Sequence, residues 1–312
     1  MADSQWPNLY IVGAVKSGTT SLYAYLKNHP EIFFPEMKEP HFFTHPKPSA
    51  EQRHYIRYTA TEREYLRLYA RAGHYRYRGD ASPSYLWAPH AAAEIARYSP
   101  HAQILIILRD PVERAYSQYL MDFNEGVIDL PFWDALQRDW QRPDKGWGVS
   151  QLYVELGLYS EQIARYFRSF GRDRVQVMLL EHLHTQPLQV LRKISAALQI
   201  DPSPFRKVNL QVAHNHYAQP RGNWARRLAA HPVSRTIGEK FFPSQWGEYI
   251  WRQIFLRPQK KPLMDPHAKE WLMTIYEPEL LRLEELLGRP LPELRRSWST
   301  CSVQSSLAVT AS

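Results

Sequence analysis

The stretch Asn8–Ser21, which reads NLYIVGAVKSGTTS, decides the fold class. Its first part, residues 8–13, is an apolar run that ends on glycine and predicts a buried strand. Small residues around Lys16 follow, and residues 21–28 then show helical spacing of their apolar side chains. Loop N–H groups and a helix N-terminus together attract anions. A strand, a loop of this composition and a helix, in this order, therefore predict a phosphate-binding loop.

Strand-like and helix-like segments alternate along the rest of the chain. The clearest strand is Gln103–Leu108 (QILIIL), an unbroken apolar run of the kind found in buried parallel strands. Further strands are predicted at 75–79 and 175–180, and helices at 61–70, 89–98, 111–126, 163–170, 187–198 and 276–287. This alternation favours an α/β fold with a central, mainly parallel sheet flanked by helices.

The predicted domain organisation is one domain over residues 1–298, followed by a disordered tail at 299–312. Within the domain, residues 200–265 mix prolines, basic residues and aromatic residues without a clear period. Two interpretations stay open for this segment. It forms a few short helices packed on the sheet, or it is a lid or acceptor-binding insertion.

Composition narrows the class of protein. Of 312 residues, 44% are hydrophobic and 22% are charged, which excludes a mainly disordered or fibrous chain. Lys and Arg number 39 against 31 Asp and Glu, a net charge of +8 that favours anionic partners. The single cysteine, Cys301, leaves no intrachain disulfide and no cysteine-based zinc site. With no signal-peptide pattern at residues 1–5, we expect a cytoplasmic protein.

A second candidate anion-binding element follows the strand at 103–108. Arg109 comes directly after that strand, where open α/β sheets bind their ligands. Ser117 lies eight residues further on, about two helical turns, and so returns towards the same ligand. A guanidinium and a hydroxyl are suitable partners for a terminal phosphate. The alternative is a salt bridge from Arg109 to Asp110 or Glu113.

The loop at residues 13–21 departs from the Walker A pattern of nucleoside triphosphatases, because its lysine precedes the second glycine. The strand at 103–108 also does not end in a free acidic side chain that could bind Mg²⁺. Both observations favour transfer of a sulfuryl group, which carries less charge than a phosphoryl group. Two alternatives stay open: a P-loop NTPase or small-molecule kinase, and a non-enzymatic polyanion-binding protein that uses residues 221–261.

Taken together, the segments Lys16–Leu22 (KSGTTSL) and Leu108–Tyr119 (LRDPVERAYSQY) resemble the PAPS-dependent sulfotransferases, where PAPS is 3′-phosphoadenosine 5′-phosphosulfate. Lys38–Phe43 (KEPHFF) and Ser82–Tyr85 (SPSY) are similar to the heparan-sulfate-type branch of that family and its bacterial relatives. The resemblance implies a P-loop-like sulfotransferase fold. It also implies metal-free, in-line transfer from PAPS to a hydroxyl or amine, on a carbohydrate or small natural-product acceptor.

The resemblance also implies roles for individual residues in binding PAPS. Lys16 would contact the transferring sulfuryl group and the bridging oxygen. The 5′-phosphate would be wrapped by Ser17, Gly18, Thr19 and Thr20. The 3′-phosphate would be held by Arg109 and Ser117, with Arg221 and Gly222 as candidates for a later basic-glycine element.

Glu39 lies where the heparan-sulfate-type branch places its catalytic base. An acceptor hydroxyl has a high pKa, so a carboxylate that takes its proton during attack lowers the barrier. His41 is the rival base, since imidazole suits the same task. A structural role for His41 and an ordinary surface position for Glu39 are the simpler alternatives.

Overall fold

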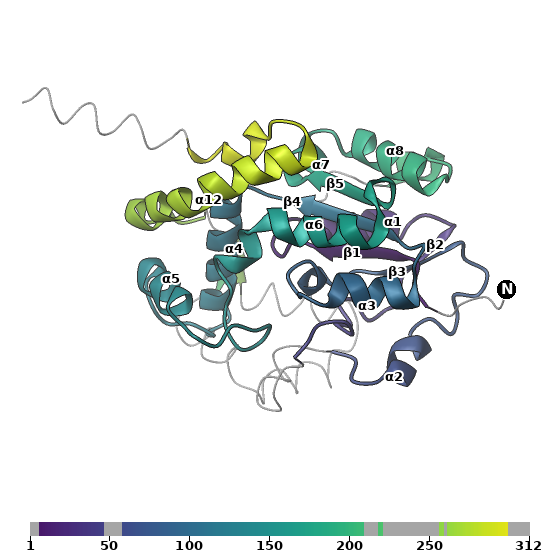
Figure 1. Cartoon of the computed structure of the whole chain (residues 1–312), viewed down its shortest axis with the longest axis horizontal. Helices are drawn as coiled ribbons and strands as arrows, with labels where there is room; N and C mark the ends of the chain where they lie inside the picture. Colours follow the sequence, from purple (N-terminus) through teal and green to yellow (C-terminus); the bar gives the residue numbers. More distant parts are fainter. Residues whose placement is uncertain (1–5, 47–57, 209–217, 221–255, 259–260, 299–312) are drawn as a thin grey trace, which may run out of the picture.

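A five-stranded sheet, parallel in every pairing, lies at the centre of the computed structural model (Figure 1). The structure describes residues 6–46, 58–208, 218–220, 256–258 and 261–298. The strands of the sheet are β1 (Leu9–Gly13), β2 (Ile32–Phe33), β3 (Tyr77–Asp80), β4 (Gln103–Leu108) and β5 (Val175–Leu179). Their order is β2-β3-β1-β4-β5, which confirms the predicted α/β class.

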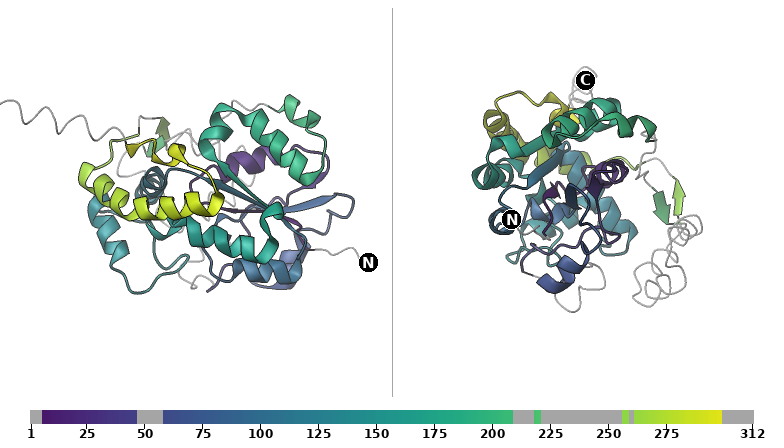
Figure 2. Two further views of the ribbon diagram at one scale, coloured as in Figure 1. Left: turned by 45° about the horizontal axis from the view of Figure 1, so that its top comes forward. Right: turned by 90° about the vertical axis from the view of Figure 1, so that its right-hand side faces the viewer.

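Helices connect these strands and cover both faces of the sheet (Figure 2). In chain order the α-helices are α1 (Thr19–Leu26), α2 (Glu62–Arg67), α3 (Ala91–Tyr98), α4 (Pro111–Asn124), α5 (Phe132–Trp140), α6 (Tyr159–Phe170), α7 (Leu180–Thr185), α8 (Pro187–Leu198) and α12 (Pro266–Leu287). A separate antiparallel pair is formed by β6 (Ala218–Pro220) and β7 (Leu256–Pro258).

Two hydrophobic cores lie on opposite faces of the sheet, because successive side chains of a strand point to opposite sides. In β1, Tyr10 and Val12 pack in the core that α3, α6 and α12 cover. Leu9 and Ile11 pack in the core that α1 and α8 cover. All five residues of β1 are buried, which explains why its sequence is an apolar run without alternation.

The strand order places a topological switch point between β1 and β4. From β1 the chain runs out to β2 and back to β3 on one side, and β4 then pairs with the other side of β1. In open α/β sheets the crevice at the carboxyl ends of two such strands is the usual ligand site. Both predicted anion-binding elements begin there: one follows Gly13, and the other follows Leu108.

Several elements differ from the sequence predictions. The two-residue strand β2, the helices α5 and α7, and the strands β6 and β7 were not predicted. The last helix begins at Pro266, ten residues before the predicted start at 276, with Asp265 accepting a hydrogen bond from the N–H of Ala268 as its N-cap. Pro278 lies inside this helix, in the part that the sequence predicted.

Some predictions concern residues that the structure does not describe. The tail at 299–312 and most of the segment 200–265 lie outside the described residues, and the single-domain organisation stays a prediction. Among the helices that the structure does describe, none combines the length and the apolar character of a membrane span.

Candidate functional site

The loop between β1 and α1 depends on a glycine at position 18. Gly18 is the N-cap of α1 and has a φ of 91°, in the left-handed region that side chains disfavour. A Cβ atom there would lie 2.5 Å from Cδ1 of Leu180, at the start of α7. Ser17 is fully buried beside it, and Thr19 opens the helix. The predicted succession of strand, loop and helix is therefore confirmed, and the binding of an anion there stays a prediction.

Lys16 is the cation of this loop. Its Nζ lies 3.3 Å from the Sδ atom of Met121 on α4, the hydrogen-bond partner that the structure gives it. Burial lowers the pKa of Lys16, whereas the carboxylates of Glu125, Asp122 and Glu39 act in the opposite direction. A partly buried lysine with a thioether as neighbour is poorly satisfied, so an anionic ligand would improve its environment.

Arg109 follows β4 and reaches the loop directly. Its Nη1 donates to the main-chain oxygen of Lys16 at 3.3 Å, and its Nη2 lies 3.3 Å from Oε2 of Glu113. The hydroxyl of Tyr159 donates to the main-chain oxygen of Arg109 at 2.9 Å and fixes its backbone. The structure therefore brings together the two elements that the sequence predicts to share one ligand. Ser117, on α4, lies one turn beyond Glu113.

Arg109 forms the alternative salt bridge with Glu113. Asp110 instead caps the helix α4. Asp110 caps α4 by accepting from the N–H groups of Val112 at 3.0 Å and Glu113 at 3.3 Å. It also accepts from the hydroxyl of Ser297 at 2.5 Å, which ties the end of the described chain to the start of α4. Burial raises the pKa of Asp110. Its role in the structure is to set the direction in which α4 leaves the site.

Lys261 is a functional candidate that sequence reasoning did not single out. Its Nζ lies 2.5 Å from Oε2 of Glu113 and 4.8 Å from the centre of the Tyr116 ring. The Tyr116 hydroxyl donates to the main-chain oxygens of Pro262 and Leu263, so the segment after Lys261 is held against α4. The sequence shows only that basic residues are frequent at 221–261. It does not indicate which of them lies near Arg109.

Glu39 and His41 lie in a strained segment beside the loop. Their φ angles are 61° and 50°, both left-handed. Glu39 forms an ion pair with Lys38, and its Oε2 lies 3.6 Å from Nε2 of His41. Burial raises the pKa of Glu39, but His41 and Lys38 outweigh that effect and lower it to about 2. Glu39 is therefore ionised at neutral pH and lies within electrostatic reach of Lys16.

His41 is buried and held from several sides. Its Nδ1 lies 2.6 Å from Oγ of Ser84, and its main-chain N–H donates to Oγ of Ser82 at 3.1 Å. The Ser82 hydroxyl in turn donates to Asp80 at 2.7 Å. Only 6% of the His41 side chain is exposed, against 34% for Glu39. Of the two candidate bases, Glu39 is the more exposed to solvent.

Asp122 is a second titratable group that the sequence did not reveal. It lies on α4 next to Met121 and is buried, and its Oδ2 accepts from the Tyr153 hydroxyl at 2.9 Å. Burial raises its pKa to about 7, although the Tyr153 hydrogen bond and nearby Lys16 lower it. The sequence of α4 alone does not predict the burial of Asp122, because its partner Tyr153 comes from a different part of the chain.

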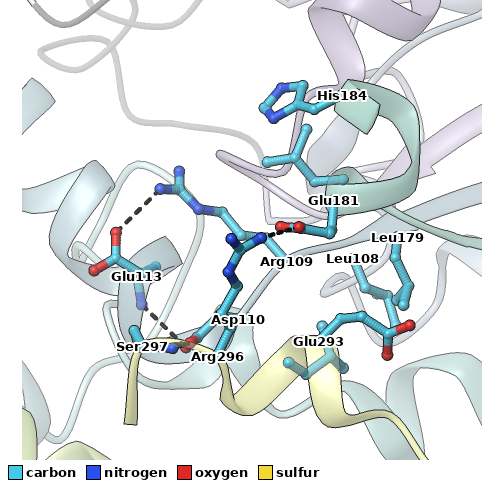
Figure 3. A pocket seen from close by; sticks show the side chains of 12 residues that line it. Leu108, Arg109, Asp110, Glu113, Leu179, Glu181, His184, Glu293, Arg296 and Ser297 are labelled. Atoms are coloured by element: carbon cyan, nitrogen blue, oxygen red, sulfur yellow. Dashed lines mark hydrogen bonds and ion pairs between the residues drawn. The ribbon is translucent and has the colours of Figure 1, made fainter. Parts of the chain in front are cut away.

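A cavity of about 390 Å³ opens at the carboxyl ends of β4 and β5, next to Arg109 (Figure 3). Charged side chains line it: Arg109 and Glu113 form one ion pair, and Arg296 forms another with Glu181. His184, whose pKa is lowered by burial and by Arg109, lies on the same wall. The cavity provides room for a polar ligand beside the switch point.

Two of the predicted site residues, Arg221 and Gly222, lie outside the described residues. Apart from Ser117 on α4, the others divide into two groups that meet at Lys16. Lys16, Ser17, Gly18, Thr19 and Thr20 form the loop with Arg109 against it. Glu39 and His41 contact each other, and the charge of Glu39 acts on Lys16.

Comparison with known proteins agrees with this geometry. The model of the sulfotransferase family matches residues 7–204. Carbohydrate sulfotransferase 15 of Rattus norvegicus is 26% identical over 247 residues, which cover 63% of this chain and 44% of the relative. Heparan sulfate glucosamine 3-O-sulfotransferase 3A1 of Mus musculus is 28% identical over 193 residues, covering 61% and 45%. The chain thus spans about half the length of the curated relatives it matches.

Among solved structures, a sulfotransferase from Alicyclobacillus acidocaldarius superposes with a TM-score of 0.70 at 29% sequence identity. The alignment covers 93% of this chain and 99% of that chain. The similarity therefore extends well beyond the segment that contains the loop and Arg109.

Proposed function

Because the chain belongs to the sulfotransferase family, we propose that it transfers a sulfuryl group from PAPS to a hydroxyl or amine acceptor. One observation carries the proposal: the guanidinium of Arg109 lies 3.3 Å from the main chain of Lys16, at the switch point of the sheet. Two anion-binding elements so close together suit one nucleotide with two anionic ends. A nucleotide with a single phosphate chain would leave one of them unused.

The residues at this site fit PAPS in charge and in donors. Lys16 and the N–H groups at the start of α1 would hold the 5′-phosphosulfate, with Ser17, Gly18, Thr19 and Thr20 around it. Arg109 and Ser117 would hold the 3′-phosphate, to which we add Lys261 on the geometry of its contact with Glu113. Arg221 and Gly222 stay proposed contributors. Arginine suits this role because its planar donors match phosphate oxygens in pairs.

In the proposed mechanism, the chain's own residues position the reactants and move one proton. When bound, PAPS supplies the sulfuryl group, and adenosine 3′,5′-bisphosphate is the leaving product. Glu39 accepts the proton that the acceptor loses as its oxygen or nitrogen bonds to sulfur. Lys16 stabilises the charge that develops on the leaving phosphate oxygen. His41 holds Glu39 in place through the 3.6 Å contact and stays the alternative base.

A carboxylate with a low pKa is a modest base in the ligand-free protein. Two cationic or hydrogen-bonding neighbours, Lys38 and His41, cause the low pKa of Glu39. An acceptor that draws Lys38 away would raise the basicity of Glu39, because that cation stabilises the ionised form. Base strength would then increase when the acceptor binds, which is the moment at which the reaction needs it.

For the acceptor we propose a carbohydrate or a small natural product. The names of two similar proteins contain carbohydrate and heparan sulfate, which supports a sugar hydroxyl or amine.

We also propose a single catalytic domain over residues 1–298 in a cytoplasmic, bacterial-type enzyme. The presence of a single cysteine in the sequence agrees with a reducing compartment.

A thermal-shift assay with adenosine 3′,5′-bisphosphate in EDTA, followed by transfer of radiolabelled sulfate from PAPS to a panel of sugars and phenols, tests the proposal. We expect stabilisation by the bisphosphate without Mg²⁺ and label in at least one acceptor. Stabilisation by ATP that requires Mg²⁺ would favour the kinase alternative. Binding of heparin with a steep salt dependence and no response to any nucleotide would favour the polyanion-binding alternative.

A further inference from the structure

Arg109 and Lys261 share one carboxylate oxygen. Oε2 of Glu113 lies 3.3 Å from Nη2 of Arg109 and 2.5 Å from Nζ of Lys261. The two cations come from positions far apart in the sequence, after β4 and before α12. Their side chains and that of Glu113 are each between 24% and 31% exposed, so a ligand from solvent can reach the group. The arrangement is that of an anion held between two cations.

Both cations are anchored without Glu113. Arg109 donates to Lys16 through Nη1, and its own main-chain oxygen accepts from Tyr159. Lys261 packs on the Tyr116 ring, whose hydroxyl holds the two residues that follow. Glu113 is therefore not required to keep the cations in place. What it does is neutralise one of their two positive charges.

We propose that Glu113 competes with the nucleotide's 3′-phosphate for Arg109 and Lys261, and that it thereby limits the affinity of the protein for the nucleotide. The inference rests on the proposed function. A phosphate oxygen that enters between Arg109 and Lys261 takes over the contacts that Glu113 makes. The displaced carboxylate stays nearby on the first turn of α4, because its backbone is fixed by the Asp110 cap.

The charges explain the effect on affinity. With Glu113 ionised, the three side chains carry a net charge of about +1, whereas a 3′-phosphate brings nearly two negative charges. The carboxylate therefore competes with an entering phosphate for the two cations, and it repels a phosphate that is bound there. A weaker grip on the 3′-phosphate would help the bisphosphate product to leave after transfer.

The test is Glu113→Gln, which keeps the size and shape of the side chain but removes its charge. Isothermal titration measures the affinity of each protein for adenosine 3′,5′-bisphosphate and for adenosine 5′-monophosphate, which lacks the 3′-phosphate. We expect the variant to bind the bisphosphate about tenfold more tightly and the monophosphate unchanged. Glu161→Gln is the matched control, since it removes a carboxylate that pairs with Arg168 on an exposed face of α6.

Glu113→Ala is the second variant and removes the hydrogen-bonding atoms as well as the charge. Tighter bisphosphate binding in both variants, with Glu161→Gln unchanged, supports the inference. Equal or weaker bisphosphate binding in both variants overturns it, because Glu113 would then only hold Arg109 in position. If the unaltered protein binds no adenosine nucleotide at all, the proposed function fails first, and the result is distinct from a failure of this inference.

Discussion

The guanidinium of Arg109 donates to the main-chain oxygen of Lys16 at 3.3 Å, joining two elements that lie 93 residues apart in the sequence. The contact crosses the gap between β1 and β4, where the strand order reverses. It fixes the loop after β1 relative to the start of α4, and so sets the distance between the two proposed phosphate sites. A ligand that uses both sites finds them already arranged, which lowers the entropy lost on binding.

Replacing Lys16 with alanine should abolish transfer. In the proposed mechanism the lysine stabilises the charge on the leaving oxygen, and loss of one such group lowers turnover about a hundredfold or more. The measurement is label transfer from PAPS under saturating donor. Lys27→Ala serves as the control, because it removes an exposed lysine at the far end of α1. Equal losses in the two variants would contradict a specific role for Lys16.

Replacing Glu39 with glutamine should lower turnover by about 10² to 10⁴ while leaving donor affinity nearly unchanged. Glutamine keeps the shape of the side chain but cannot accept the acceptor proton. Glu36→Gln is the control, an exposed acid three residues earlier in the same segment. Turnover like that of the unaltered protein in Glu39→Gln would show that another group is the base.

The pH profile separates the two candidate bases within the same experiment. Since the pKa of Glu39 in the free protein is about 2, kcat/KM should show no acid limb between about pH 5 and 7. An acid limb between about pH 5 and 7 would contradict Glu39 as the base, because a group with a pKa of about 2 is already ionised there, and His41 would remain as the candidate. The two outcomes differ in a range where the folded protein can be assayed.

Arg109→Lys should weaken binding of adenosine 3′,5′-bisphosphate about tenfold, because lysine keeps the charge but loses the paired donors. Ser117→Ala should weaken it by about three- to tenfold, the value of one lost hydrogen bond. Neither variant should change the affinity for adenosine 5′-monophosphate. Calorimetry with both nucleotides measures these effects, and a parallel loss for the monophosphate would place the two residues elsewhere on the ligand.

The buried carboxyl of Asp122 should make stability depend on pH. Its pKa rises from 3.8 to about 7 on folding, so the folded state holds a proton that the unfolded state releases between about pH 4 and 7. Stability therefore falls as the pH rises through that window, by an amount on the order of 4 kcal/mol. Urea unfolding at several pH values measures the slope.

Asp122→Asn should remove most of this pH dependence, because the amide does not ionise and its oxygen can still accept from Tyr153. Asp134→Asn, at an exposed position on α5, is the matched control and should keep the slope. An unchanged slope in Asp122→Asn would show that other groups account for the pH dependence.

The sequence predicts the parts of the fold that depend on local pattern. β1, and β4 from Ile104 onward, are apolar because both strands are covered on two faces, and this pattern identifies them as central. The two residues of β2 are too few to show a period. The first ten residues of α12 were missed, although Asp265 and Pro266 are residue types that commonly begin a helix.

For the site, sequence reasoning could name the loop and Arg109, since each follows a recognisable strand. It could not find Lys261, which reaches Glu113 across 148 residues through a contact that only the fold creates. The raised pKa of Asp122 likewise depends on burial by distant residues. Glu39 and His41 have left-handed backbone angles although neither is a glycine, so the sequence does not predict this conformation.

The most direct test of the central claim is a crystal structure of the protein with adenosine 3′,5′-bisphosphate. We predict one nucleotide at the switch point, with its 5′-phosphate on the N–H groups at Gly18–Thr20 and its 3′-phosphate on Arg109. A nucleotide that contacts only one of these two elements, or that lies away from the carboxyl ends of β1 and β4, would contradict the account.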